Sequence, residues 1–241
     1  QSDIHSKVSE HTIDDSIIFA EHNPVYTLGK NADQNNILSK YPKDVEIHNI
    51  DRGGDVTYHG PGQLVGYPII NIKNLNMSIG RYVHTLEEIL VNTLKVFDIT
   101  AKRKNKLVGV WVCDEKIAAI GVRVQKGVTK HGFALNVNTD LSYFDGIIPC
   151  GINNCKMTSM EQLLHKNIKI NRIVSSNHLD ETEYIQEEDE WLILVEGKAT
   201  LLLDQTMKRL TKGDTLFIPS KTRHRVLNTQ NGTIWLTVHI F

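Results

Sequence analysis

The sequence is poor in cysteine and carries almost no net charge, and both shortages limit what the protein can be. Three cysteines in 241 residues are too few for a disulfide framework, which favours a reducing, cytoplasmic setting. The 27 lysines and arginines nearly balance the 28 aspartates and glutamates, so charge points to neither a nucleic acid nor an anionic membrane as partner. No apolar run approaches the ~20 residues that span a bilayer. We therefore expect a soluble protein whose function resides in local sites.

The pattern of apolar residues predicts two domains. Up to about residue 170, apolar segments alternate with Gly-rich loops and include one stretch of helical period. Beyond it the chain is first polar and acidic, and then consists of short strands and turns without a helical period. We expect a first domain over residues 1–170 and a small all-β domain over residues 171–241.

Within the first domain, the pattern predicts particular elements. Apolar residues recur at helical spacing between Ser78 and Ile99, and Ser78 is a suitable N-cap. Residues 45–72 read as a strand, a Gly-rich loop and a second strand, and residues 107–140 predict an antiparallel meander. Thr158 to Glu161 has the spacing of a capping box, so a short helix should begin there.

The Gly-rich loop is the first candidate for a functional site. Residues 52–63, RGGDVTYHGPGQ, contain four glycines and one proline, which suits a backbone that passes close to a ligand or turns sharply. Arg52, Tyr58, His59 and Gln63 supply polar groups around it. A Gly-rich surface turn is the alternative. A second His-Gly pair, His131-Gly132, has the same two interpretations.

Lys116 and Cys150 are the candidates for chemistry. Lys116 precedes an apolar strand, so it is either a solvated turn lysine or a desolvated amine that acts as a base. Cys150 lies between Pro149 and Gly151 and is a packed core thiol, a metal ligand or a nucleophile. A metal site with Cys155 is weakly supported, because C-x4-C has no second close pair. A nucleophile needs a base that only folding can bring near, so the residues alone leave the question open.

Six segments occur in order within residues 17–165, namely EHNPVYTLG, RGGDVTYHGPGQLVGYP, KIAAIGVRV, HGFALNVN, FDGIIPCGI and TSMEQ. Together they resemble the motifs of the lipoyl(octanoyl) transferase family, the LipB-type octanoyltransferases of lipoate biosynthesis. The resemblance implies an α/β fold like the catalytic domain of biotin and lipoate protein ligases, with a mixed, largely antiparallel sheet and flanking helices. It also implies transfer of an octanoyl group from acyl carrier protein to a lysine of a lipoyl domain, in 2-oxoacid dehydrogenase E2 subunits or glycine cleavage H protein.

The same resemblance assigns roles to residues. Cys150 matches the acyl-accepting cysteine and Lys116 its partner in a Cys/Lys dyad, while seven residues match motifs that line the substrate pocket: Arg52, Gly53, Gly54, Tyr58, His59, His131 and Gly132. The reaction implies no ATP, metal or other cofactor, since a thioester is already activated. An ATP-using lipoate ligase is the rival within the fold, and a non-catalytic sensor that serves a ligand-binding module is the rival from another class.

The tail resembles a cupin, a small β-barrel. EWLILVEG fits the end of the first cupin motif, and GDTLFIPSKTRHRVLN fits the second. Tyr184 and Gln186 occupy the positions of two usual histidines, so Glu190 and His224 are left as weak metal candidates. Because two protein ligands rarely hold a metal firmly, we expect no metal and a barrel that binds a small molecule or mediates association.

Overall fold

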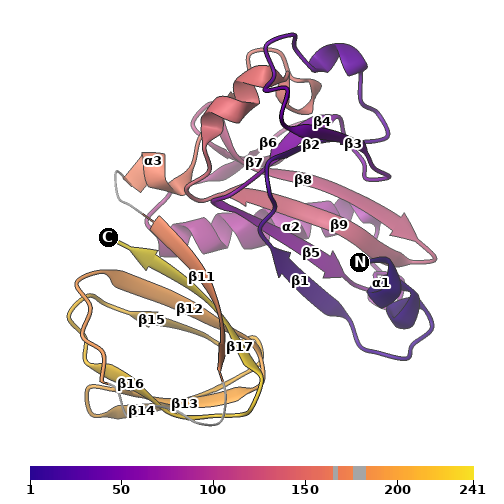
Figure 1. Cartoon of the computed structure of the whole chain (residues 1–241). Helices are drawn as coiled ribbons and strands as arrows, with labels where there is room; N and C mark the ends of the chain where they lie inside the picture. The colour runs from indigo at the N-terminus through magenta and orange to yellow at the C-terminus, as the bar shows by residue number, and fades with distance from the viewer. Residues whose placement is uncertain (165–167, 176–182) are drawn as a thin grey trace. The chain divides into compact units, whose positions relative to one another are not determined.

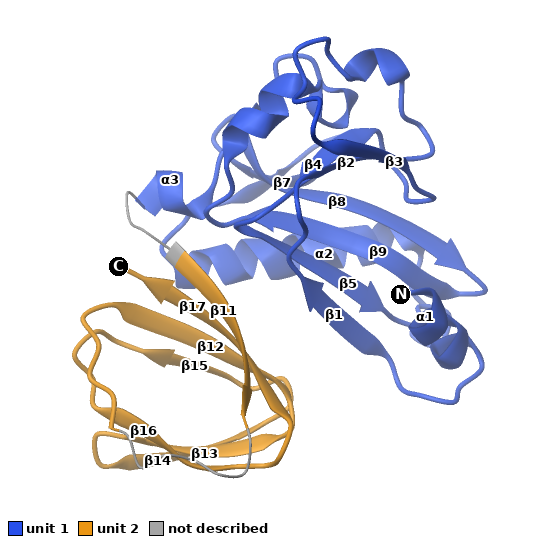
Figure 2. Ribbon diagram, viewed as in Figure 1, with its two compact units in different colours: residues 1–164 blue, residues 165–241 orange. Residues whose placement is uncertain are grey.

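The chain forms two compact units, residues 1–164 and 165–241 (Figure 2). The structure, a computed structural model, describes residues 1–164, 168–175 and 183–241. The sequence-based division after residue 170 would cut β11 (Ile168–Ser175), which pairs along its whole length with β17 (Thr233–Ile240) of the second unit. The two units are therefore described separately.

The first unit is built on a seven-stranded sheet with the strand order β1-β5-β9-β8-β7-β6 (Figure 1). Its pairs are antiparallel except that β10 runs parallel to β8, so the mixed, largely antiparallel sheet of the expected α/β fold is confirmed. The predicted meander is also correct, since β7, β8 and β9 are consecutive antiparallel strands. The strands are β1 (Ser16–Ala20), β5 (Gln63–Ile69), β6 (Lys102–Lys104), β7 (Leu107–Val112), β8 (Glu115–Gln125), β9 (Val128–Asn136) and β10 (Lys156–Met157).

Helix α2 (Ile79–Val96) covers one face of this sheet. Ser78 caps it as predicted, because the Ser78 side chain accepts a hydrogen bond from the Arg81 N–H at 3.2 Å. Apolar residues of α2 pack against Ile120, Val122 and Val124 of β8. Since side chains alternate along a strand, Ala119 and Gly121 of β8 face the other side of the sheet. That opposite face carries the site described below.

A three-stranded sheet, β3-β2-β4, makes up the rest of the first unit's β structure. Its strands are β2 (Val25–Leu28), β3 (Glu46–Asn49) and β4 (Val56–His59). The expected strand, loop and strand of residues 45–72 thus contain a third strand, β4, inside the Gly-rich segment. Thr57 and Val56 allow this because β-branched residues favour extended backbone, and pairing with β2 provides the hydrogen bonds.

Short helices complete the first unit. α1 (Ser2–Ser9), η1 (Gln34–Asn36), η2 (Leu141–Gly146) and η3 (Pro149–Gly151) precede α3 (Met160–Leu164). The predicted capping box at Thr158 and Glu161 is wrong by one residue, since Ser159 Oγ accepts from the Gln162 N–H at 3.2 Å. Thr158 is instead bound to the sheet, because its backbone N–H donates a hydrogen bond to Lys116 O at 3.0 Å. None of the helices in the described ranges is both long and apolar enough to cross a membrane.

The second unit is all β, which confirms the cupin-like prediction. Two sheets, β11-β17-β12-β15 and β14-β13-β16, enclose a core that includes Leu194, Leu201, Ile218 and Trp235. The remaining strands are β12 (Asp189–Glu196), β13 (Lys198–Leu203), β14 (Thr206–Thr211), β15 (Thr215–Ile218) and β16 (His224–Thr229). Alternate residues of β12 are buried, so Glu190 points to the same side as Leu192 and Leu194.

Candidate active site

Lys116 and Cys150 come together in the first unit. Lys116 Nζ lies 3.1 Å from Cys150 Sγ, although 34 positions separate the two in sequence. Lys116 is only 2% exposed, so the interpretation as a solvated turn lysine is wrong. Cys150 is partly exposed and so can be reached by a substrate. The contact therefore places an amine beside a thiol, which is the arrangement that a cysteine nucleophile with a lysine base would need.

The turn at Cys150 is held in a conformation that presents the sulfur. Cys150 has φ 57, in the left-handed region that non-glycine residues rarely adopt. Gly151 follows with φ 67, and a Cβ there would lie 2.6 Å from Asp55 Oδ2. Asn36 braces the turn from two sides, because Asn36 O accepts from the Ile148 N–H at 2.7 Å and Asn36 Nδ2 donates to Asp55 Oδ2 at 2.8 Å. The proline-cysteine-glycine turn therefore leaves the sulfur partly exposed and next to Lys116.

A cavity of about 550 Å³ opens beside the two residues, between the two sheets of the first unit. Its volume is typical of a small-molecule site. The seven-stranded sheet contributes small residues that pair across neighbouring strands, Ala119 with Ala134 and Gly121 with Gly132. The smaller sheet contributes Val25, Thr27, Thr57 and His59. These strands thus line a channel, in part with small side chains, whose lining also includes Lys116 and Cys150.

Five of the seven predicted pocket residues line this cavity, namely Arg52, Gly54, His59, His131 and Gly132. Tyr58 does not. Because side chains alternate along β4, Thr57 and His59 face the cavity while Tyr58 faces the core, where its ring stacks on Tyr143 at 4.7 Å. The prediction that Tyr58 lines the pocket is therefore wrong.

Gly53, the other predicted residue outside the lining, fixes the Gly-rich loop to the sheet. Its N–H donates to Val122 O at 2.9 Å. A Cβ on Gly121 would lie 2.9 Å from Gly53 O and 3.0 Å from Arg52 Cδ. The glycines thus allow a close backbone approach, here of the loop to β8 rather than to a ligand.

Arg52 is a buried cation held by neutral oxygens. It is 7% exposed, and its guanidinium donates to Thr27 O at 2.6 Å, to Thr27 Oγ1 at 3.0 Å and to Gly53 O at 3.1 Å. Burial lowers the pKa of Arg52, while negative charge on Cys150 and Asp55 acts in the opposite direction. A thiolate at Cys150 and the Arg52 cation therefore stabilise each other.

His59 is a neutral imidazole with a defined tautomer. Gln63 Nε2 donates to Tyr58 O and to Asn136 Oδ1, so Gln63 Oε1 accepts from His59 Nδ1 at 2.8 Å. His59 Nε2 then carries a free lone pair. Burial lowers the pKa of His59 to about 4, so the ring remains neutral at physiological pH.

This lowered pKa predicts a pH-dependent stability. Between about pH 4 and pH 6.5 the unfolded chain binds a proton at His59 that the folded chain does not, so the free energy of unfolding rises with pH in this window. It should fall by on the order of 2 kcal/mol as pH drops from 6.5 to 4. In His59→Asn, which keeps a donor toward Gln63, this contribution should be absent. Urea unfolding at several pH values between 4 and 6.5 measures the change in the free energy of unfolding, with the exposed His84, replaced by asparagine, as control. If this free energy depends on pH in His59→Asn as it does in the wild type, the prediction is contradicted.

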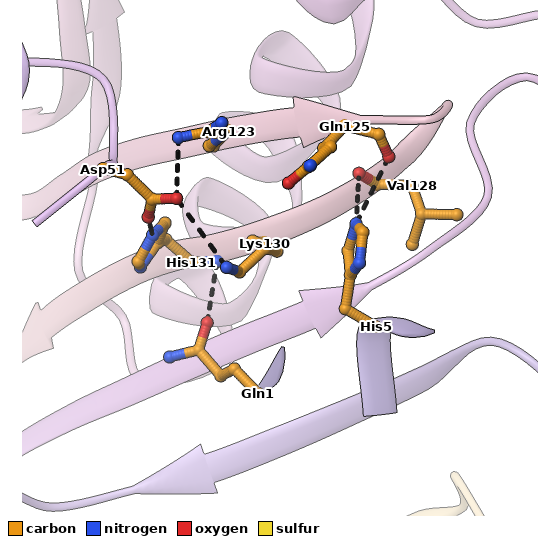
Figure 3. A network of polar contacts seen from close by, with 8 residues as sticks. All are labelled: Gln1, His5, Asp51, Arg123, Gln125, Val128, Lys130 and His131. Carbon is orange, nitrogen blue, oxygen red and sulfur yellow. Dashed lines mark hydrogen bonds and ion pairs between the residues drawn. The ribbon is translucent and has the colours of Figure 1, made fainter. Parts of the chain in front are cut away.

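His131 belongs to a charged network that the sequence did not reveal (Figure 3). Its Nε2 donates to Asp51 Oδ1 at 2.6 Å, and Asp51 Oδ2 also receives Arg123 Nη1 at 2.7 Å and lies 3.7 Å from Lys130 Nζ. The hydrogen bond from His131 lowers the pKa of Asp51, and burial lowers the pKa of His131. Asp51 thus fixes the ring and leaves Nδ1 as an acceptor.

Other cavity residues were also missed. His22 and Tyr67 line the cavity, and His22 Nε2 lies 2.5 Å from the Tyr67 hydroxyl. Burial lowers the pKa of His22 and raises that of Tyr67. A strict period-two reading of LVGYP puts Tyr67 on the same face as Val65, whereas His22 precedes the strand in EHNPVYTLG and carries no such signal.

Burial distinguishes Cys155 from Cys113 and should make it the slower of the two to react with an alkylating reagent. Burial raises the pKa of the Cys155 thiol, so little thiolate forms at neutral pH. Cys113 is exposed. With limiting iodoacetamide at pH 7, Cys113 should be labelled well before Cys155, as peptide mapping would show. Equal labelling of the two would contradict this prediction.

Inside the second unit, Glu190 and His224 lie near each other. Glu190 Oε2 is 3.8 Å from His224 Nε2 and accepts from Gln186 Nε2 at 3.0 Å. His239 Nε2 lies 3.7 Å from Glu190 Oε1, a contact that the sequence did not predict because it depends on β17 joining β12. Within the described parts of the chain, no set of three or more His, Cys, Asp or Glu residues is arranged to hold a metal ion.

Comparison with known proteins identifies the family of the chain. A family model described as the lipoyl protein ligase A/B catalytic domain matches residues 1–177, and a cupin domain model matches residues 176–239. The octanoyltransferase of Alkaliphilus metalliredigens is 48% identical over 157 residues, covering 63% of this chain and 72% of that protein. The octanoyltransferase of Clostridium kluyveri is 44% identical over 190 residues, covering 75% and 81%.

A solved structure supports the fold of the first unit. Protein Ta0514 of T. acidophilum, described as a candidate lipoate protein ligase, superposes with a TM-score of 0.50 at 16% identity, covering 67% of this chain and 74% of that one. With the matches above, the chain belongs to the lipoyl protein ligase A/B catalytic domain family, and it is an acyltransferase of the octanoyltransferase type followed by a cupin domain.

Proposed function

We propose that the protein transfers an octanoyl group from acyl carrier protein to a lysine of a lipoyl domain, through a thioester on Cys150. The observation that carries the proposal is the 3.1 Å contact between Lys116 Nζ and Cys150 Sγ at the cavity. An ATP-using ligase has no need of a cysteine in this position. We infer the octanoyl group from the name of the relatives, octanoyltransferase, and the lipoyl domain as acceptor from the family.

The first half of the reaction forms the acyl-enzyme. Lys116 accepts the thiol proton of Cys150, and the thiolate attacks the carbonyl carbon of the octanoyl thioester. The carbon–sulfur bond to the carrier breaks, and Lys116 returns the proton to the departing thiol. Arg52, held by neutral oxygens nearby, favours the negative sulfur. The octanoyl chain lies in the channel along the small residues of β8 and β9.

The second half transfers the group to the acceptor. The lysine amine of the lipoyl domain attacks the thioester carbonyl on Cys150, an amide forms, and the carbon–sulfur bond to Cys150 breaks. Lys116 takes a proton from the attacking nitrogen, and the Cys150 thiolate is restored. One cysteine thus serves two large protein partners in turn. The acceptors are lipoyl domains of 2-oxoacid dehydrogenase E2 subunits and glycine cleavage H protein.

The test is transfer between purified components without ATP. The chain should move an octanoyl group from octanoyl-acyl carrier protein to an apo lipoyl domain, seen as a mass increase on the domain and its absence when the target lysine is replaced by arginine. Free octanoate with ATP should give no product. Product only from octanoate and ATP would favour a ligase, and no product from either donor would favour the sensor; both outcomes contradict the proposal.

A further inference from the structure

A buried carboxylate behind the active site has no part in the reaction described above. Glu87 on α2 is 3% exposed, and its Oε1 accepts a hydrogen bond from the Gly109 N–H at 2.8 Å. The bond joins the helix to β7. A carboxylate is costly to bury, so its placement against a single backbone N–H calls for a reason.

Gly109 lies directly against the side chain of Lys116. A Cβ on Gly109 would lie 2.5 Å from Lys116 Cε, 3.2 Å from Lys116 Nζ and 2.6 Å from Ala118 O. Gly109 also has φ +125, a conformation that favours glycine. The backbone at this point therefore forms a wall that touches the end of the lysine, and only glycine fits there.

The neighbouring strand is bent at the same place. Trp111 pairs with Lys116, but Val110 pairs with Ala118, so Ile117 is an extra residue on β8. Such a bulge changes the direction of the side chains around it. The bulge turns Lys116 toward Cys150, and the wall at Gly109 limits where the flexible lysine can go.

We propose that Glu87 and Gly109 are positioning residues that hold Lys116 Nζ against Cys150 Sγ. The proposal rests on the proposed function for the role it gives to the lysine. Glycine is conformationally free, so the backbone at Gly109 stays in position only if another contact fixes it. The hydrogen bond from the Gly109 N–H to Glu87 Oε1 provides that contact. Lysine has four rotatable side-chain bonds, and the wall removes the arrangements in which its amine leaves the sulfur.

The test measures the thiol itself as well as acyl transfer. In a Cys113→Ser/Cys155→Ser background, the rate of Cys150 alkylation by iodoacetamide is followed from pH 6 to pH 10 by intact mass. The variants are Gly109→Ala, Glu87→Ala and Glu87→Gln, with Lys116→Met as reference. Gly127→Ala is the matched control, because Gly127 has φ +82 in the β8–β9 turn and does not line the cavity. Circular dichroism establishes that each variant is folded.

We expect the alkylation profiles of Gly109→Ala and Glu87→Ala to move to that of Lys116→Met. The rate of acylation by octanoyl-acyl carrier protein should fall about 100-fold, the lower end of what a general base contributes. Glu87→Gln, whose Oε1 still accepts from Gly109, should keep the wild-type profile, and so should Gly127→Ala. If Gly109→Ala does not fold, the comparison of Glu87→Ala with Glu87→Gln still tests the proposal, because only the first of these variants loses the hydrogen bond to Gly109.

The proposal is overturned if folded Gly109→Ala or Glu87→Ala keeps the wild-type alkylation profile while Lys116→Met does not. It is also overturned if Lys116→Met itself keeps the wild-type alkylation profile, since the amine then does not affect the reactivity of the Cys150 thiol. Failure of the proposed function shows separately, as wild-type protein that forms no octanoyl adduct although its alkylation profile still depends on Lys116.

Discussion

Replacing Cys150 with serine should abolish the acyl-enzyme. Incubated with octanoyl-acyl carrier protein, the wild-type chain should gain the mass of one octanoyl group, and Cys150→Ser should gain none. A serine hydroxyl is a much weaker nucleophile than a cysteine thiol near neutral pH, so the same base cannot activate it to a comparable degree. The rate of transfer to the lipoyl domain should fall by on the order of 10⁴-fold or more, as when other enzymes lose a nucleophile.

Cys155→Ser is the matched control for this experiment. It lies in the same stretch of chain, but its side chain does not line the cavity that contains Cys150. The variant should acquire the octanoyl group at the wild-type rate. An adduct on Cys150→Ser, or an adduct mapped to Cys155 in the wild type, would show that the sulfur at position 150 is not the acceptor.

Replacing Lys116 with methionine should slow acylation by about 10²- to 10⁴-fold, the usual contribution of a general acid or base. Methionine fills most of the buried volume and has no amine to desolvate, so the variant should be at least as stable as the wild type. The residual acylation rate should rise with pH, because hydroxide then generates the thiolate in place of the amine. Single-turnover measurements with octanoyl-acyl carrier protein at several pH values provide the comparison.

Lys156→Met serves as control for Lys116→Met. Lys156 is exposed and lies on β10, beside the start of β8, so it shares the neighbourhood without touching the sulfur. Its loss should leave the acylation rate within a few-fold of the wild type. Acylation of Lys116→Met at the wild-type rate would remove the lysine from the mechanism.

Features set by neighbouring residues were predictable from the sequence. The cap at Ser78 and the meander of β7 to β9 depend on local periodicity and turns, and both are present. The strand β4 was not predicted, because the pairing of Thr57 with β2 outweighs the glycines around it. Local patterns therefore identified most elements but not the one that carries His59.

The site itself was predictable only in part. Periodicity left Cys150 open among three roles, since Lys116 lies 34 positions away in sequence, on β8. The motif resemblance selected Lys116, and folding brings the two together. No local pattern in the sequence singled out Asp51 or Glu87. Their roles arise from long-range contacts, with His131 in one case and with Gly109 in the other, that no local pattern contains.

The glycines paired across β8 and β9 have a consequence for how such an enzyme can diversify. A Cβ on Gly121 would lie 2.9 Å from Gly53 O, and a Cβ on Gly132 would overlap Gly66 O. Any substitution at these two positions therefore displaces neighbouring backbone before it reshapes the cavity. Changes in substrate preference must come from other lining residues, such as Ala119 and Ala134.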